Sequence, residues 1–342
     1  MAMTLVGEPS DSAPPGTAPG WEPALANAVT TPAELCRLLA LDAALAADAE
    51  EPARQFPMLV PRTLLSRMAH GGVKSPVLRQ FLPSPAELVA VAGFSADPVE
   101  EAGGACAPGV LCKYPGRSLM VATKCCGVHC RYCFRRHFPY GSGTAADHDW
   151  RPALAEIARD ATTCEVILSG GDPLTLPDAE LARLADRLAA IPHVRRLRVH
   201  TRMPVVLPER VGPELTGWLR ATRLTPIVVV QVNHGAELDA EAGAALGRLV
   251  DAGVPVLSQS VLLRGVNDSV DVLAALFERL VELRVMPYYL HQLDRVAGAA
   301  HFEVPEADGK ALVAALRLQL PGYAVPRYVW QPPSGPSKRV LA

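Results

Sequence analysis

The sequence predicts an α/β fold, a partial (β/α)6 TIM-like barrel with a helical extension before it. From residue 118 onward, short apolar segments alternate with amphipathic ones, as strands alternate with helices. Such an order implies right-handed crossovers and a parallel sheet. Six units are too few for a closed eight-stranded barrel, so an open barrel is expected, with a doubly wound sheet as the alternative.

The expected strands are short and rich in Val, Leu and Ile, and they cover residues 118–124, 164–170, 194–202, 226–235, 254–263 and 285–294. The helices expected between them include 178–190, 213–221, 239–252 and 270–283. Residues 21–112 contain short helical segments that prolines separate, and they are expected to form a helical subdomain. Its clearest helix is 32–48, with Thr31 as the N-cap and Pro32 at the first helical position. Residues 1–20 are rich in Pro, Gly and Ser and are expected to be a disordered tail.

Composition excludes several classes of function. The 342 residues are 49% hydrophobic and 20% charged, with a formal net charge of −2 and no long basic run, so no nucleic-acid or anionic membrane surface is expected. No apolar stretch is long enough to span a membrane, and no secretory signal begins the chain, so a cytoplasmic protein is expected. Disulfides are not expected in that reducing compartment. Cys36 and Cys164 are expected to be buried, and Cys106 and Cys112 have no assigned role.

Polar residues follow each expected strand. They stand in the cysteine-rich loop 125–133, in 169–173, 200–202, 233–234, 259–268 and 291–294. Because the carboxyl ends of parallel strands meet at one end of the fold, these side chains are expected to share one active-site mouth.

The cysteine loop suggests a metal centre. Cys126, Cys130 and Cys133 have the spacing C-x3-C-x2-C. A zinc site would need a fourth ligand, which His129 or His137 could supply. Alternatively, three thiolates can hold a four-iron cluster and leave one iron open for a non-protein ligand. Adjacent ligands on one metal are strained, so Cys125 is expected to be a bystander.

This motif, with Tyr132 just before its third cysteine, resembles that of the radical S-adenosylmethionine enzymes. The resemblance implies that S-adenosylmethionine chelates the open iron and yields a 5′-deoxyadenosyl radical, on a partial six-unit barrel. The segment Ser169-Gly170-Gly171-Asp172 resembles the family's glycine-rich segment that holds the cofactor's amino group. Its glycines are expected to let the backbone approach that ligand closely.

Six segments narrow the resemblance. RYCFRRHFPY, SGGDPL, HTRMPV, QVNH, QSVLLRGVND and PYYLHQLD together resemble the lysine 2,3-aminomutase family, in particular the branch that makes (R)-β-lysine for elongation factor P. The resemblance covers about residue 50 to the C-terminus. It implies L-lysine as the substrate and a [4Fe-4S] cluster, S-adenosylmethionine and pyridoxal 5′-phosphate as cofactors. It also implies a reductant protein for the cluster and a downstream ligase acting on elongation factor P.

The resemblance assigns roles to individual residues. Lys338, in Gly335-Pro336-Ser337-Lys338, matches the lysine that forms a Schiff base with pyridoxal phosphate, and Lys113, Tyr114 and Arg117 match residues that contact that cofactor. Arg135 matches the arginine that binds the substrate carboxylate, and Asp294 the acid that pairs with the ε-ammonium. The expected contacts to S-adenosylmethionine are Ser169, Gly170, Gly171, Asp172, Asn233, His234 and Gln259. Residues 113–300 would then be the barrel, and 301–342 the segment that carries the lysine and closes over the barrel mouth.

One position departs from the family pattern. Enzymes acting on free lysine carry a second acid seven residues before the cofactor lysine, and here that residue is Gln331. An alternative is therefore an aminomutase that makes a free β-amino acid from lysine or from another amino acid. A remoter alternative is a non-catalytic, zinc-binding interaction module. A homo-oligomer is compatible with either.

Overall fold

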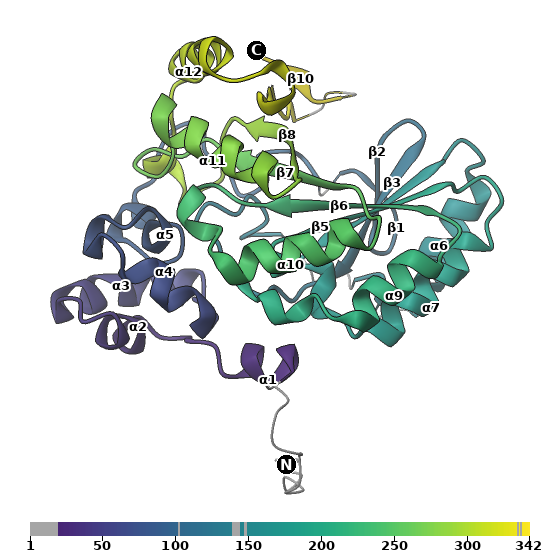
Figure 1. Cartoon of the computed structure of the whole chain (residues 1–342), viewed down its shortest axis with the longest axis horizontal. Helices are drawn as coiled ribbons and strands as arrows, with labels where there is room; N and C mark the ends of the chain where they lie inside the picture. Colours follow the sequence, from purple (N-terminus) through teal and green to yellow (C-terminus); the bar gives the residue numbers. More distant parts are fainter. Residues whose placement is uncertain (1–19, 102, 139–143, 147–148, 334, 336) are drawn as a thin grey trace, which may run out of the picture.

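The computed structural model describes residues 20–101, 103–138, 144–146, 149–333, 335 and 337–342. Apart from Gly20, the predicted tail 1–20 lies outside these residues. Figure 1 shows one large sheet with helices along its outer face, the N-terminal helices gathered at one end and the C-terminal segment at the top of the view. Among the described residues, no helix has the length and apolar character needed to cross a membrane.

Within the described residues, the sheet has ten strands that neighbour one another in sequence order. The six expected strands are present and parallel, as β3 (Arg117–Thr123), β4 (Glu165–Gly170), β5 (Arg196–Thr201), β6 (Thr225–Gln231), β7 (Val256–Val261) and β8 (Met286–His291). A seventh parallel strand that the sequence analysis missed, β9 (Arg327–Trp330), pairs with β8. Strands β1 and β10 stand at the two ends of the order of described strands and are not neighbours, so the barrel is open. This confirms the predicted fold class.

Amphipathic helices cover the outer face of the sheet (Figure 1). They are α6 (Arg151–Arg159), α7 (Asp178–Ala189), α9 (Pro213–Ala221), α10 (Ala240–Asp251) and α11 (Val270–Glu282), with the single turn α8 (Met203–Val206) between β5 and α9. In α10, the buried residues Ala242, Ala245, Leu246 and Leu249 recur at helical spacing, which gives one apolar face for the sheet. The four predicted helices therefore form within one residue of their expected bounds.

The N-terminal region packs as short helices, namely α1 (Trp21–Ala26), α2 (Pro32–Leu38), α3 (Ala43–Gln55), α4 (Leu65–Ala69) and α5 (Pro76–Arg79). Thr31 caps α2 as predicted, since its hydroxyl accepts from Glu34 N. The prediction of one helix over 32–48 is wrong. The chain breaks at Ala40, which has φ 51°, and Asp42 then caps a second helix.

Single 3-10 turns connect these elements. They are η1 (Arg62–Leu64), η2 (Gly72–Lys74), η3 (Pro85–Leu88), η6 (Pro173–Thr175), η7 (Pro208–Arg210), η8 (Gly235–Glu237), η9 (Ala300–Phe302) and η10 (Gly322–Ala324).

The end of the expected helical subdomain is a β-hairpin instead. Strands β1 (Ala105–Ala107) and β2 (Val110–Tyr114) are antiparallel, and β2 pairs with β3. The turn carries Gly109 at φ +71°, where an added Cβ would lie 2.3 Å from Ala145 N. The hairpin brings Cys106 opposite Cys112, and the two form a disulfide with Cα atoms 5.8 Å apart. The expectation of no disulfide is therefore wrong, because strand pairing brings these two thiols together.

The C-terminal segment folds back over the carboxyl ends of the parallel strands, as predicted. After helix α12 (Glu306–Gln319), β9 joins the sheet, and β10 (Arg339–Val340) pairs antiparallel with β9. The buried Tyr328 of β9 donates its hydroxyl to Gln292. An added Cβ on Gly309 would lie 2.1 Å from that hydroxyl oxygen, so glycine lets α12 pack closely on the strand. This packing fixes the tail that carries Lys338.

Candidate active site

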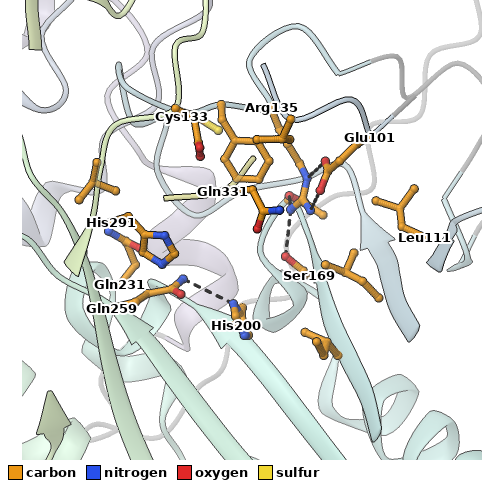
Figure 2. A pocket seen from close by; sticks show the side chains of 18 of the residues that line it. Glu101, Leu111, Cys133, Arg135, Ser169, His200, Gln231, Gln259, His291 and Gln331 are labelled. Carbon is orange, nitrogen blue, oxygen red and sulfur yellow. Dashed lines mark hydrogen bonds and ion pairs between the residues drawn. The ribbon is translucent and has the colours of Figure 1, made fainter. Parts of the chain in front are cut away.

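A cavity of about 750 Å³ opens at the carboxyl ends of the parallel strands. We call it the central cavity; Figure 2 shows part of its lining. Fourteen of the predicted site residues line it: Lys113, Tyr114, Arg117, Cys126, Cys130, Cys133, Arg135, Ser169, Gly170, Gly171, Asp172, Gln259, Asp294 and Lys338. Residues more than 200 positions apart in sequence thus meet in one place, and a shared mouth is what the topology predicted.

The three cysteine thiols lie on one wall of the central cavity. Cys133 N donates to Cys130 O at 3.0 Å, so a tight turn joins the second and third thiols. Burial raises the pKa of Cys126, and it raises the pKa of Cys133 to about 11. Thiolates in such a place need a positive centre beside them, and an iron–sulfur cluster supplies one. The donor set therefore fits a cluster held by three thiolates.

Cys125 is exposed and is not part of the cavity lining. Its carbonyl oxygen instead accepts from Asp172 N at 2.7 Å, which joins the cysteine loop to the segment after β4. An added Cβ on Gly171 would lie 2.1 Å from that same oxygen, and Gly170 has φ +108°. Close packing of two protein segments thus requires these glycines. The sequence analysis expected a different reason, namely close approach of the backbone to a ligand.

The Asp172 carboxylate is committed to protein groups. It accepts from the Thr201 hydroxyl at 2.7 Å, from Arg202 N at 2.7 Å and from Leu174 N at 3.0 Å. Burial raises its pKa, which these donors partly offset. Asp172 thus ties the glycine-rich segment to the end of β5 and holds one cavity wall in shape.

Arg202 lies behind the cysteine loop, where its guanidinium donates to Cys130 Sγ at 2.8 Å and to Glu237 Oε2 at 2.5 Å. Asn233 is fully buried in the same network, and its amide donates to the Tyr132 hydroxyl at 2.7 Å. His234 caps η8 by accepting from Ala236 N. Neither Asn233 nor His234 lines the central cavity, in contrast to their expected role as contacts of S-adenosylmethionine. The Asn233 side chain is buried in the network around Tyr132, and the His234 ring caps η8.

Arg135 is held by a residue that the sequence analysis missed. Glu101 accepts from both arms of its guanidinium, with Nε and Nη2 each 2.7 Å from a carboxylate oxygen (Figure 2). Ser169 Oγ accepts from Nη1 at 2.9 Å. The fork therefore binds a carboxylate bidentately in this structure, which is the chemistry expected of a residue that grips an amino-acid carboxylate. No motif or spacing in the sequence points to Glu101.

The tail brings Lys338 into the lining of the central cavity. Its amine donates to Gln331 Oε1 at 2.8 Å, and the Tyr114 hydroxyl donates to the same oxygen. Burial lowers the pKa of Lys338 to about 8, and the charge of Asp294 opposes that shift. Burial raises the pKa of Asp294 to about 7. An amine that loses its proton near neutral pH is suited to bond with an aldehyde carbon.

Two more residues expected near pyridoxal phosphate have protein partners. Lys113 Nζ donates to Val99 O at 2.7 Å and to Pro333 O at 2.5 Å, so it ties the tail to the segment before β1. The guanidinium of Arg117 lies 5.3 Å from the centre of the Tyr114 ring. Lys113 and Tyr114 thus hold the tail in place, which the sequence analysis did not anticipate.

The floor of the cavity is polar. His200, Gln231, Gln259 and His291 come from the ends of β5 to β8 and point into the cavity (Figure 2). Gln259 Nε2 lies 3.4 Å from His200 Nδ1, while the buried Nε2 of His200 has no hydrogen-bond partner among the described residues. Burial lowers the pKa of His200, and it lowers the pKa of His291 to about 3. Neutral imidazoles with a spare nitrogen fit a polar organic ligand.

No family model matches the chain. It is 42% identical over 322 residues to the L-lysine 2,3-aminomutase of Escherichia coli strain K12, a match covering 94% of each chain. It is 38% identical to the enzyme of that name from Haemophilus influenzae, over 94% of this chain and 95% of the relative. The match to the Clostridium subterminale enzyme is 34% and covers 93% of this chain and 76% of the relative. A solved structure, Streptococcus suis SuiB bound to S-adenosylmethionine, is 13% identical with a TM-score of 0.46, over 65% of this chain and 52% of that one.

An open α/β barrel whose mouth carries C-x3-C-x2-C thiols defines the class of radical S-adenosylmethionine enzymes. Identity above 30% over nearly the whole chain narrows the class. The chain belongs to the L-lysine 2,3-aminomutase family, whose members are isomerases that use a [4Fe-4S] cluster, S-adenosylmethionine and pyridoxal phosphate.

Proposed function

We propose that this protein converts L-lysine to (R)-β-lysine, and that the product serves the modification of elongation factor P. The observation that carries the proposal is the meeting of three groups in one cavity. The cysteine thiols line one wall, the Arg135 fork lies beside them, and the C-terminal Lys338 enters with Asp294. A 2,3-aminomutase needs a radical source, a grip on the amino acid and an amine that holds pyridoxal phosphate, and each group suits one of these tasks.

The cysteine thiols would hold the cluster and Lys338 would hold pyridoxal phosphate; together with S-adenosylmethionine, these groups supply radical formation and the migration of nitrogen from Cα to Cβ. The chain's own residues orient the substrate and exclude water. Leu111, Leu119, Ile167, Val261 and Leu293 are among the apolar residues of the lining. Low polarity there strengthens the charge pairs that hold the amino acid.

The two ends of lysine would be held by opposite charges. Arg135 would take the α-carboxylate in place of Glu101, since its fork already binds a carboxylate with two bonds. Asp294 would accept from the ε-ammonium, which returns its carboxyl group to the ionised form despite burial. Fixing both ends decides which Cβ hydrogen faces the radical source.

The role in modification of elongation factor P rests on the six resembling segments. With it we propose a cytoplasmic location, a reductant protein for the cluster and a ligase that attaches the product. Gln331 favours one alternative, an aminomutase that releases a free β-amino acid or acts on another amino acid. Its amide is neutral and engaged by Tyr114 and Lys338, so it offers no charge to an ammonium.

An anaerobic assay tests the proposal. The reconstituted protein is incubated with dithionite, S-adenosylmethionine and L-lysine, and the products are separated by chirality. We expect (R)-β-lysine, and iron and sulfide in the purified protein. Equal rates with a second amino acid would favour the alternative. Stoichiometric zinc without iron, and no product from any amino acid, would refute the aminomutase activity. Transfer of the product to elongation factor P by its ligase tests the finer proposal.

A further inference from the structure

Gln331 contacts both Lys338, in the C-terminal tail, and Tyr114, in β2. Its side-chain oxygen accepts from Lys338 Nζ at 2.8 Å and from the Tyr114 hydroxyl. A carbonyl oxygen has two lone pairs, and these two donors use both. Gln331 is buried, at 9% exposure, so this arrangement is not shared with bulk water.

Tyr114 determines which way the amide faces. Its hydroxyl donates to Oε1, and the amide nitrogen of Gln331 lies 3.4 Å from Pro332 O as a donor. A flipped amide would present an N–H group to the Lys338 amine, where it would oppose the ammonium form or occupy the lone pair of the neutral form. Burial raises the pKa of Tyr114, so its hydroxyl keeps its proton and remains a donor at neutral pH. Tyr114 therefore keeps an acceptor, and not a donor, in front of the amine.

The charge of residue 331 matters because several charged groups already surround the amine. Asp294 and Glu101 favour the protonated form of Lys338, and Arg198 and Lys113 oppose it. With burial these charges place the pKa of Lys338 at about 8. A carboxylate at position 331 would add a third acid to Asp294 and Glu101. It would lie at hydrogen-bond distance from the amine and stabilise the ammonium form. A neutral amide holds the amine at the same place without that effect.

We propose that Gln331 is a positioning residue for Lys338. Its amide oxygen, oriented by the Tyr114 hydroxyl, holds the amine in the central cavity without adding a charge that would keep it protonated, so that the amine can capture pyridoxal phosphate as a nucleophile. In the capture step, the nitrogen lone pair of Lys338 bonds to the aldehyde carbon. The carbonyl oxygen leaves as water with the two amine protons, so no oxidant or reductant is needed. The inference rests on the proposed role of Lys338.

The test measures the pH dependence of capture. Anaerobically purified protein that retains its cluster is freed of pyridoxal phosphate, and the rate of its covalent reattachment is followed by absorbance across pH 6–10. For the wild type the midpoint is expected near 8, the pKa of Lys338. In Gln331→Glu it should rise by about 1–3 pH units, since an opposite charge now lies within hydrogen-bond distance. Capture at pH 7 should then be at least about tenfold slower.

Gln319→Glu is the matched control, because it adds the same charge at an exposed site at the end of α12. Its midpoint should equal that of the wild type. A role of Gln331 in folding alone would change the amount of active protein and leave the midpoint in place. Tyr114→Phe tests the same contact from the other side and adds no charge. Loss of the orienting hydroxyl should slow capture about fivefold.

Borohydride reduction and mass spectrometry separate the possible failures. A label on Lys338, with a raised midpoint in Gln331→Glu, supports the inference. A label on Lys338 with an unchanged midpoint overturns the inference and leaves the proposed function standing. A label on any other lysine overturns the inference together with the assigned cofactor lysine. If Gln331→Glu does not fold, Tyr114→Phe decides, and an unchanged capture rate in that variant overturns the inference.

Discussion

Substitution of Glu101 should make the protein less stable and yet improve its affinity for the amino acid. Glu101 and Arg135 form a bidentate pair whose side chains are 11% and 7% exposed. Breaking a buried pair costs about 3–5 kcal/mol. Arg135 keeps its bonds to Ser169 and to Gly170 O. We therefore expect Glu101→Gln to lower the free energy of unfolding of the ligand-free protein by about 2–3 kcal/mol.

The same change should lower KM for lysine. If Arg135 binds the substrate carboxylate as proposed, that carboxylate must displace Glu101 from the fork in the wild type, but only a neutral amide in Glu101→Gln. A gain of about tenfold in affinity corresponds to ~1.4 kcal/mol, a modest part of the pair's energy. Urea unfolding gives the stability, and initial rates at full cofactor loading give kcat and KM separately.

Asp178→Asn is the matched control, since Asp178 and Arg210 form a bidentate pair at 2.8 Å whose side chains are 13% and 0% exposed. The Asp178–Arg210 pair lies outside the lining of the central cavity, so the Asp178→Asn protein should lose stability without any change in KM. Unchanged or raised KM in a fully loaded Glu101→Gln protein would refute the idea that Glu101 and the substrate compete for Arg135.

Further predictions concern the other groups of the cavity. Alanine at any one of the three motif cysteines should remove iron and all turnover, whereas Cys125→Ala should keep both; iron and sulfide analysis decides. Asp294→Asn should lower kcat/KM for lysine about ten- to hundredfold with cofactor content intact, through loss of a charge-assisted hydrogen bond. Because burial raises the pKa of Asp294 from 3.8 to about 7, the folded state binds a proton that the unfolded state has released between these values. The free energy of unfolding of the ligand-free protein should therefore fall as pH rises through that window, and Asp294→Asn should flatten the fall. In oxidised protein, Cys112→Ser should cost about 2 kcal/mol of stability, through the loss of a short closed loop, and a thiol reductant should give the same loss in the wild type.

The strands could be predicted because each is a short apolar run that ends in polar residues, and that pattern depends on local sequence. The shared mouth followed from topology alone, since parallel strands bring their carboxyl ends together. Lys338 was assigned to the site through resemblance, because a lysine near a chain end has no local signal of burial. Its entry into the cavity depends on the pairing of β9 with β8 and on the packing of Gly309 against Tyr328.

What the sequence did not reveal depends on contacts between distant residues. The Glu101–Arg135 pair joins residues 34 positions apart, and the Tyr114–Gln331 bond joins residues 217 apart. Neither has a spacing that a motif could record. The Cys106–Cys112 disulfide depends on a hairpin in a region whose prolines favoured helical fragments. Asn233 was expected at the mouth because it follows a strand, yet the side chain turns to Tyr132 behind the wall.

Because residue 331 is a neutral amide, other groups of the central cavity would have to pair with the charges of the substrate. In the proposed function, the substrate carboxylate would replace Glu101 at Arg135, so the charge around that guanidinium would stay balanced. The remaining ammonium must be matched elsewhere, and Gln331 carries no charge to match it. Asp294 can do so because its pKa of about 7 leaves it ready to ionise when a cation arrives. The same neutrality leaves the Lys338 amine free of a third acid. In the proposed function, the neutral amide at position 331 would thus favour capture of the cofactor and leave recognition of the substrate's ammonium to Asp294.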